Sequence, residues 1–235
     1  MTSIGTDKTI KSTSSSTSTL TVPEGKFKLY YFSMNGRGFA PRVALTTAGF
    51  DFEDIRISYE ELGKLRIGKN GEAYNEKFPL GTVPILVFPD GERILTQSAA
   101  ISRFAGKYCD LYPQDPLKAF IVDEIVDICS DINSSAPQSP DKEKKKELRE
   151  KYAKEQLPKY FNLISKRLDE SDGSFILGDN LSTADLTLFS IVDLFANGMF
   201  DYIPYETLQP WKNVIDHYNA VKNHPIVIKS KAIKQ

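Results

Sequence analysis

The sequence predicts two structural units, a small α/β domain with a mixed sheet and then an all-helical domain. Every segment typical of a strand lies before residue 111, and every convincing segment after residue 115 has apolar residues at helical spacing. Between them, residues 111–116 carry Pro113 and Pro116, which is typical of a linker. We therefore expect the domains to span residues 26–110 and 116–235.

The α/β domain is predicted from the order of its segments. Residues 27–32 form an aromatic and aliphatic run typical of a strand, and Pro41 suits the first turn of a helix that Gly49 ends. A second strand is expected over 52–57, and the stretch 58–78 is polar and irregular. The remaining expected elements are two hairpin strands and a helix, over 81–88, 93–95 and 98–108. This order predicts a small sheet with helices packed on it.

The second domain is predicted from its apolar patterns. One apolar stripe at helical spacing contains Leu117, Ile121, Ile125, Ile128 and Ile132. Residues 141–168 are expected to form one long, charged helix, and the nearly apolar segment 184–196 a helix through the core. A last helix is expected to start at Pro210-Trp211 and to end near Asn223.

Charge and cysteine content narrow the classes of function. The chain has 30 basic and 31 acidic residues, so it has no overall attraction to nucleic acid or to an anionic membrane. No apolar run approaches the roughly 18 residues that span a bilayer. The two cysteines, Cys109 and Cys129, lie in no CxxC pair and far from both histidines, a pattern that does not support a disulfide framework or a zinc site. Reduced thiols favour a cytoplasmic location.

The first 25 residues are rich in Ser and Thr. Such a composition buries too little apolar surface to offset its ordering entropy, so we expect a disordered extension. Lys8 and Lys11 in a segment with few acids also suit a transit peptide, although arginine and an apolar face are missing.

Two short segments of the α/β domain suit the binding of a small acidic peptide. Pro84 stands at a strand start, and a cis bond before it would expose the Val83 backbone for pairing with an extended peptide. Gln97-Ser98 lies at a helix start, where a serine cap and backbone amides suit a carboxylate. An ordinary turn and an ordinary cap explain the same residues, so these features alone leave both interpretations open.

Four segments, in the same order along the chain, resemble the sigma class of glutathione S-transferases. They are KLYYFSMNGR at 28–37, FPLGTVPIL at 78–86, QSAAI at 97–101 and GDNLSTADL at 178–186. They correspond to the opening strand and loop, the cis-proline segment, the Gln-Ser glutathione contact and the capping motif of that family. In the last segment Ser182 and Asp185 have the spacing of a capping box, which makes physical sense at the start of a buried helix.

The resemblance covers about residues 26–230. It implies a thioredoxin-like first domain, glutathione as co-substrate, no required metal and a homodimer. The expected activity is conjugation of glutathione to small hydrophobic electrophiles, or a glutathione-dependent isomerisation of the prostaglandin type. Phe32, Met34 and Tyr108 are candidates for lining the electrophile pocket between the domains.

The resemblance also implies that the Tyr31 hydroxyl activates glutathione, with support and positive potential from Arg37. The nucleophile is the thiolate, and lowering a thiol pKa of about 8.5 by about two units requires about 2.7 kcal/mol. One hydrogen bond to a charged group supplies about 1.5–3 kcal/mol, so a single hydroxyl nearly suffices. The rival hydroxyls are Tyr30, which strand alternation places on the opposite face, and Ser33.

The remaining glutathione contacts follow from the same resemblance. Val83, Pro84 and Gln97-Ser98 are expected to bind the peptide, and Asp127 to reach its ammonium group across a dimer interface. Asp127 belongs to a row with Asp123 and Asp131, and a solvated helix face explains that row equally well.

The glycyl end of glutathione is where the sequence departs from the family. The family often places a tryptophan and a cation after the second strand, but residues 58–78 contain no tryptophan. Arg66 and Lys77 are the candidates there, and Arg66 is included in the expected site.

Two other functions are considered. A non-catalytic, transferase-like structural or assembly protein is disfavoured because Tyr31, Arg37 and Gln97-Ser98 are retained. A disulfide oxidoreductase is disfavoured because no cysteine lies at the first loop-to-helix junction.

Overall fold

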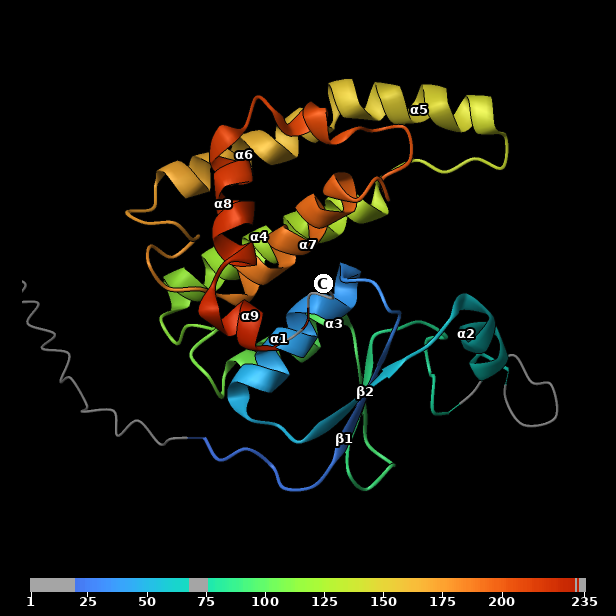
Figure 1. Cartoon of the computed structure of the whole chain (residues 1–235), viewed down its shortest axis with the longest axis vertical. Helices are drawn as coiled ribbons and strands as arrows, with labels where there is room; N and C mark the ends of the chain where they lie inside the picture. The colour runs from blue at the N-terminus through green and yellow to red at the C-terminus, as the bar shows by residue number, and fades with distance from the viewer. Residues whose placement is uncertain (1–19, 68–75, 231, 233–235) are drawn as a thin grey trace, which may run out of the picture.

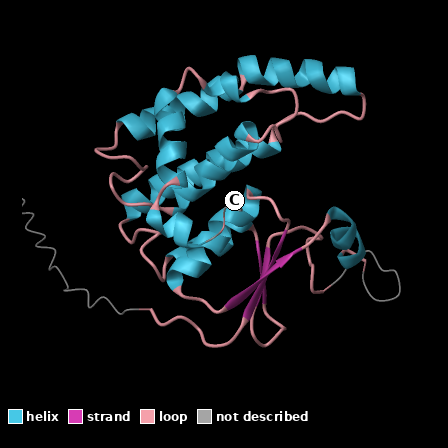
Figure 2. Ribbon diagram, in the orientation of Figure 1, coloured by secondary structure: helices cyan, strands magenta, loops and turns pink. Residues whose placement is uncertain are grey.

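The computed structural model describes residues 20–67, 76–230 and 232, and in it a domain with a sheet and helices is followed by a helical domain (Figure 1). The strands lie together in the first domain, and the second is built of helices (Figure 2). The expected disorder of the N-terminal extension concerns mainly residues 1–19, which lie outside the described residues. Within 20–25, which has no helix or strand, Val22 packs against the core.

The sheet has four strands in the order β2-β1-β3-β4. β1 pairs in parallel with β2 and antiparallel with β3, which forms a hairpin with β4. The strands are Phe27–Tyr31 (β1), Phe52–Arg56 (β2), Ile85–Val87 (β3) and Ile94–Thr96 (β4). This confirms the mixed sheet. β3 is shorter than the expected 81–88: residues 81–84 lie outside the ladder, and Pro84, directly before the strand, has no N–H to donate to it.

Helices α1 (Phe39–Ala48) and α3 (Ser98–Gly106) pack on each other and lie between the sheet and the helical domain (Figure 1). Gly49 ends α1 in the left-handed conformation, at φ 80°, as the sequence predicts. Helix α2 (Tyr59–Leu65) begins with a capping box in which Ser58 and Glu61 exchange hydrogen bonds.

The helical domain differs from the prediction at two places. The single helix expected over 141–168 is two helices, separated at Gln156. Pro158 explains the break, because proline has no N–H and its ring clashes with the carbonyl four residues earlier. After the expected last helix the chain forms one more, which packs on α1. The helices are Pro116–Ser134 (α4), Lys142–Glu155 (α5), Leu157–Asp169 (α6), Thr183–Ala196 (α7), Lys212–Lys222 (α8) and Pro225–Ser230 (α9), with short 3₁₀ turns at Gly36–Gly38 and Tyr205–Leu208.

Helix α7 runs through the core, as its apolar sequence predicts, and contacts α1, α4 and α8. Its start is held by the fully buried Asp185, which accepts hydrogen bonds from the Ser182 amide at 2.7 Å and the Ile176 amide at 2.8 Å. The Ser182 hydroxyl also donates to Asp185, at 2.6 Å. The expected capping motif therefore fixes the start of a central helix, which forms one wall of the cavity described below.

Candidate active site

A cavity of about 640 Å³ lies between the two domains, and Tyr31 lines it from the end of β1. Tyr31 is 5% exposed. Tyr30 points to the other face of the sheet, where its ring contacts Phe78 at a centroid distance of 5.6 Å and lines a separate small pocket. Ser33 is exposed and is not among the lining residues. Of the three candidate hydroxyls, only that of Tyr31 therefore belongs to this cavity.

The 3₁₀ turn after β1 holds the Tyr31 hydroxyl from the backbone. The Arg37 amide donates a hydrogen bond to Tyr31 Oη at 2.9 Å. The turn approaches so closely that a Cβ on Gly38 would lie 2.3 Å from Cδ1 of the Tyr31 ring, and one on Gly36 would lie 2.7 Å from the hydroxyl. Because the phenol oxygen accepts from an amide, its proton is left to donate to a ligand.

The environment keeps Tyr31 protonated. Burial raises the pKa of the Tyr31 phenol above its ordinary value, while the Arg37 amide and the nearby Arg37 and Arg42 charges lower it by less. The net direction is upward, so at neutral pH the hydroxyl is a neutral hydrogen-bond donor. A neutral donor in a buried site suits the stabilisation of an anion.

The Arg37 side chain joins the two domains. With the Asn133 amide oriented so that its oxygen faces Arg37, that oxygen accepts from Nε and Nη2, both at 3.1 Å. Asn133 lies on α4, and both residues line the cavity. Arg37 therefore touches the tyrosine through its backbone, while its charge faces the cavity from a position held by the helical domain.

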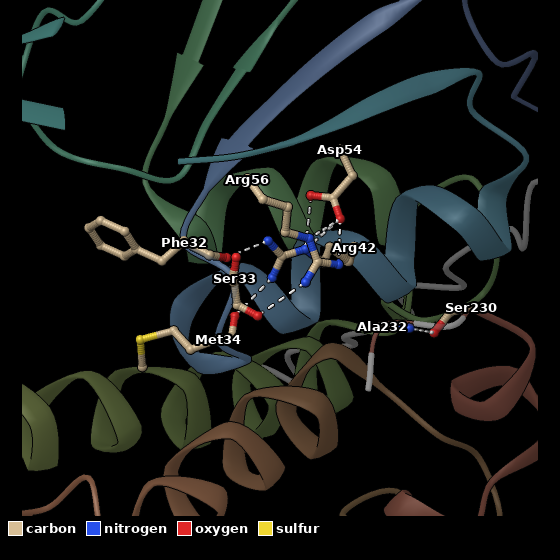
Figure 3. A network of polar contacts seen from close by, with 8 residues as sticks. All are labelled: Phe32, Ser33, Met34, Arg42, Asp54, Arg56, Ser230 and Ala232. Atoms are coloured by element: carbon tan, nitrogen blue, oxygen red, sulfur yellow. Dashed lines mark hydrogen bonds and ion pairs between the residues drawn. The ribbon is translucent and has the colours of Figure 1, made fainter. Parts of the chain in front are cut away.

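A buried ion network fixes the loop between β1 and the turn (Figure 3). Arg42 on α1 is 2% exposed, and its Nε donates to Asp54 at 3.0 Å. Its two Nη atoms donate to the carbonyls of Phe32, at 2.8 Å, and Met34, at 3.1 Å. Arg56 contacts the same carboxylate and donates to the Ser33 carbonyl at 3.2 Å.

Sequence reasoning missed this network, although a signal was available. Arg42 interrupts the apolar segment of α1, and a buried guanidinium requires acidic or carbonyl partners. Because three successive carbonyls are held, the loop cannot shift without breaking charge-assisted bonds. Asp54 and the two arginines thus position Tyr31 and Arg37 without lying in the reaction space.

The expected peptide-binding elements meet at the same cavity. The Val83–Pro84 bond is cis, and Val83, Gln97 and Ser98 line the cavity. The prediction that Ser98 caps the helix is wrong: the cap position is Gln97, at φ 69°, with no side-chain hydrogen bond to the first turn. A non-glycine residue in the left-handed region is a strained conformation typical of functional sites. The missing cap leaves the first amides of α3 without a side-chain acceptor in the described chain.

The remaining candidate residues do not all lie at the cavity. Arg66 lines the cavity, and its Nε donates to the Gly81 carbonyl at 2.5 Å, whereas Lys77 lies at the small pocket beside Tyr30. Asp127 lines the cavity and is exposed, but Asp123 binds Arg103 at 2.8 Å. The acidic row of α4 therefore does not act as one site.

Of the three residues expected to line an electrophile pocket, Phe32 and Met34 line the cavity and Tyr108 does not. Tyr108 packs instead in an aromatic cluster with Phe50 and Phe104, at centroid distances of 5.4 Å from each. The helical spacing that placed Tyr108 among the apolar residues of its helix could not distinguish the core from the cavity wall.

The described residues contain no group of three His, Cys, Asp or Glu side chains placed to hold a metal ion, and no helix long and apolar enough to cross a membrane. Burial raises the pKa of both thiols, that of Cys109 to about 11. Both side chains are therefore poor nucleophiles at neutral pH.

Comparison with known proteins assigns both domains. Residues 26–107 match the N-terminal domain of the glutathione S-transferases, and residues 127–230 match the C-terminal domain. The chain is 30% identical to glutathione S-transferase 2 of Manduca sexta over 75% of its own length and 79% of the relative's. It is 26% identical to a class-mu 28 kDa isozyme of Schistosoma japonicum, over 71% and 79%.

The fold is also similar to that of a solved structure. The prostaglandin synthase D of Nilaparvata lugens superposes with a TM-score of 0.73, at 24% identity, over 89% of this chain and 98% of the other. That similarity shows a shared fold. The match to the Manduca relative, at 30% identity over most of both chains, shows a shared family. The chain belongs to the glutathione S-transferase family, and its activity is that of a glutathione transferase.

Proposed function

We propose that the Tyr31 hydroxyl donates a hydrogen bond to the glutathione sulfur and holds it as the thiolate. The observation that carries this proposal is the amide of Arg37 on the phenol oxygen, which directs the phenol proton elsewhere, inside a cavity between the domains. One hydrogen bond to a charged group contributes about 1.5–3 kcal/mol, close to the roughly 2.7 kcal/mol that a two-unit pKa decrease requires. The Arg37 charge adds to the same effect.

Glutathione then lies along the α/β domain. The Val83 backbone beside cis-Pro84 pairs with the peptide, and Gln97, Ser98 and the first amides of α3 bind the γ-glutamyl carboxylate. Arg66, beside Gly81, holds the glycyl carboxylate. These assignments are supported by the common cavity and by the resemblance of the four sequence segments.

The protein acts as a homodimer in this proposal, with Asp127 of one subunit reaching the glutathione ammonium group of the other. Asp127 is exposed at the cavity on α4, and the same helix exposes Leu117 and Phe120, which are 68% and 58% accessible. Exposed apolar side chains of this size are typical of a contact surface. Size-exclusion chromatography with light scattering that finds only monomers would exclude this arrangement.

In the reaction, the thiolate attacks a small hydrophobic electrophile bound between the domains. With an aryl halide, the C–S bond forms as the C–halogen bond breaks, and the halide leaves with the bonding pair. Membership of the sigma class is supported by the Tyr-Phe, Met and Gly-Arg residues of the opening segment. A cytoplasmic location is supported by the two free cysteines. Isomerisation of a prostaglandin-type substrate is the second candidate, favoured by the fold shared with the Nilaparvata enzyme.

The test compares wild type with Tyr31→Phe, and uses Tyr30→Phe as the matched control. We expect Tyr31→Phe to bind glutathione but to lose most of its turnover of an aryl halide, about 10–100-fold, since one hydrogen bond to a charge is lost. Tyr30→Phe removes a hydroxyl from the other face of the same strand and should retain its rate. Full activity of Tyr31→Phe would contradict the assignment and leave Ser33 as the next hydroxyl to test.

A further inference from the structure

A buried cation lies in the part of the cavity that is farthest from the sheet. Arg149 projects from α5, a helix that Figure 1 places at the opposite end of the molecule from β1, and it lines the cavity although it is only 5% exposed. Its surroundings are the connection between α4 and α5 and the segment after α7, which contribute Gln138, Met199 and Phe200. No step of the glutathione chemistry described above uses this end.

Arg149 is oriented but not neutralised. Its Nε donates to the Pro137 carbonyl at 2.8 Å, and its Cζ lies 5.0 Å from the centroid of the Phe200 ring. Among the described residues it forms no ion pair, and its Nη atoms donate no hydrogen bond to the protein. Among the described residues, the sole side-chain nitrogen or oxygen that is both fully buried and without a hydrogen-bond partner is Nδ1 of His217. The unpaired Nη atoms of Arg149 are therefore not fully buried, and they remain accessible from the cavity that Arg149 lines.

The acid that interacts with Arg149 is also bound to a lysine. Asp201 also lines the cavity, but its carboxylate accepts from Lys145 Nζ at 2.5 Å. Burial lowers the pKa of Arg149 and Asp201 opposes this, yet an arginine stays charged at neutral pH. Asp201 is therefore shared between Lys145, which lies outside the cavity lining, and Arg149, so these three side chains together keep one positive charge. A buried charge without a counterion is unfavourable, which makes the site complementary to an anion.

We infer that the electrophile carries a carboxylate, which binds the Nη donors of Arg149 while its reactive carbon lies at the Tyr31 end. The planar guanidinium suits a carboxylate because two parallel N–H groups meet its two oxygens. Between the two ends, Ile191 and Leu194 of α7 provide an apolar wall for an aliphatic body. This inference rests on the proposed function, since it names the substrate class of the same cavity.

Addition of glutathione to such an electrophile requires no oxidant, reductant or other co-substrate. A suitable probe is an alk-2-enal with a carboxylate at its far end, because thiolates add to such molecules. The glutathione sulfur forms a bond to C3, the π electrons of the C2=C3 bond move to form the enolate, and water protonates C2. Nothing is oxidised and no group leaves. The methyl ester of the same alkenal reacts in the same way but carries no charge.

The experiment measures kcat/KM for alkenals of six to twelve carbons, each as carboxylate and as methyl ester, with full-length wild type and Arg149→Met. For the chain length that spans the cavity, we expect wild type to prefer the carboxylate by about 10–100-fold, and Arg149→Met to lower this ratio to about one. The ratio cancels any general loss of activity. Arg149→Lys should restore part of the preference, and the control Lys146→Met, which removes an exposed cation from the same helix, should keep all of it.

Binding provides a second measurement that does not depend on turnover. Calorimetry with decanoate and methyl decanoate should show the same preference in wild type and its loss in Arg149→Met, while Asp201→Asn should bind decanoate several-fold more tightly because the competing acid is removed.

Equal binding and equal kcat/KM of acid and ester at every length would overturn the inference, as would a preference that survives Arg149→Met. Failure of the proposed function looks different: wild type would turn over neither probe nor an aryl halide, and the decanoate comparison would still decide the role of Arg149. If Arg149→Met does not fold, Asp201→Asn and Arg149→Lys carry the same test.

Discussion

The two ends of the cavity are built differently. At the Tyr31 end the decisive contacts come from the backbone: the Arg37 amide on the phenol, and three carbonyls held by Arg42 and Arg56. At the Arg149 end the lining consists of side chains from α5 and from segments far apart in the sequence. Backbone contacts fix the geometry that thiolate stabilisation requires, whereas side chains at the far end can change without disturbing it. In the proposed mechanism the Tyr31 end therefore sets the chemistry, and the Arg149 end sets the choice of electrophile.

The largest effect is expected from removing the centre of the backbone-holding network. Arg42→Met leaves Asp54 with one cation and releases the Phe32 and Met34 carbonyls, so we expect a loss of about 3 kcal/mol of unfolding free energy together with most of the turnover. Urea unfolding and aryl-halide kinetics measure both. Arg56→Met, which removes the more exposed partner of the same carboxylate, should lose clearly less. Equal losses in the two variants would show that the buried contacts of Arg42 have no special role.

A smaller effect is expected from crowding the turn against the tyrosine. A Cβ at residue 38 would overlap the Tyr31 ring, so Gly38→Ala should shift the ring, destabilise the protein by about 1–3 kcal/mol and lower kcat more than it raises the glutathione KM. Gly63→Ala is the matched control, because a Cβ there has no neighbour within 4 Å. Wild-type kinetics in Gly38→Ala would mean that the turn can move without consequence.

The smallest effect is expected at the contact between the domains. Asn133→Ala removes the acceptor of the Arg37 guanidinium and should cost less than about 1 kcal/mol of stability, with a few-fold decrease in kcat/KM. Thermal unfolding and steady-state kinetics check this. A decrease as large as that of Tyr31→Phe would contradict the view that Arg37 acts mainly through its backbone amide.

Features that depend on local sequence could be predicted, and features that depend on contacts between distant segments could not. The four-stranded sheet and the cap at Gly49 follow from local patterns, and the cis bond at Pro84 and the position of Tyr31 at the cavity follow from the short motifs of the resemblance. The role of Arg42 could not be obtained in that way, because its partners lie on a loop and on another strand. Tyr108 was misplaced because helical spacing defines a buried face but not what that face meets.

The far end was the least predictable part of the site. Arg149 lies in a helix whose sequence, KEKKKELREKYAKE, is that of a solvated surface, and nothing local distinguishes it from the neighbouring cations. Its contacts are with Phe200, some fifty positions further along the chain, and with the Pro137 carbonyl in the connection before α5. Such contacts are tertiary, and a periodicity argument does not contain them.

The most direct test of the account is the pKa of the glutathione thiol in the complex, followed by its ultraviolet thiolate absorbance in wild type and Tyr31→Phe. Because the phenol pKa is raised, the hydroxyl remains a donor through the neutral range, and the bound thiol should ionise about two units below its ordinary value of about 8.5 in wild type. In Tyr31→Phe the thiol should titrate near the ordinary value, and at saturating glutathione the pH profile of kcat/KM for the aryl halide should move upward with it. The same low thiol pKa in both proteins would contradict the central claim that the Tyr31 hydroxyl stabilises the thiolate.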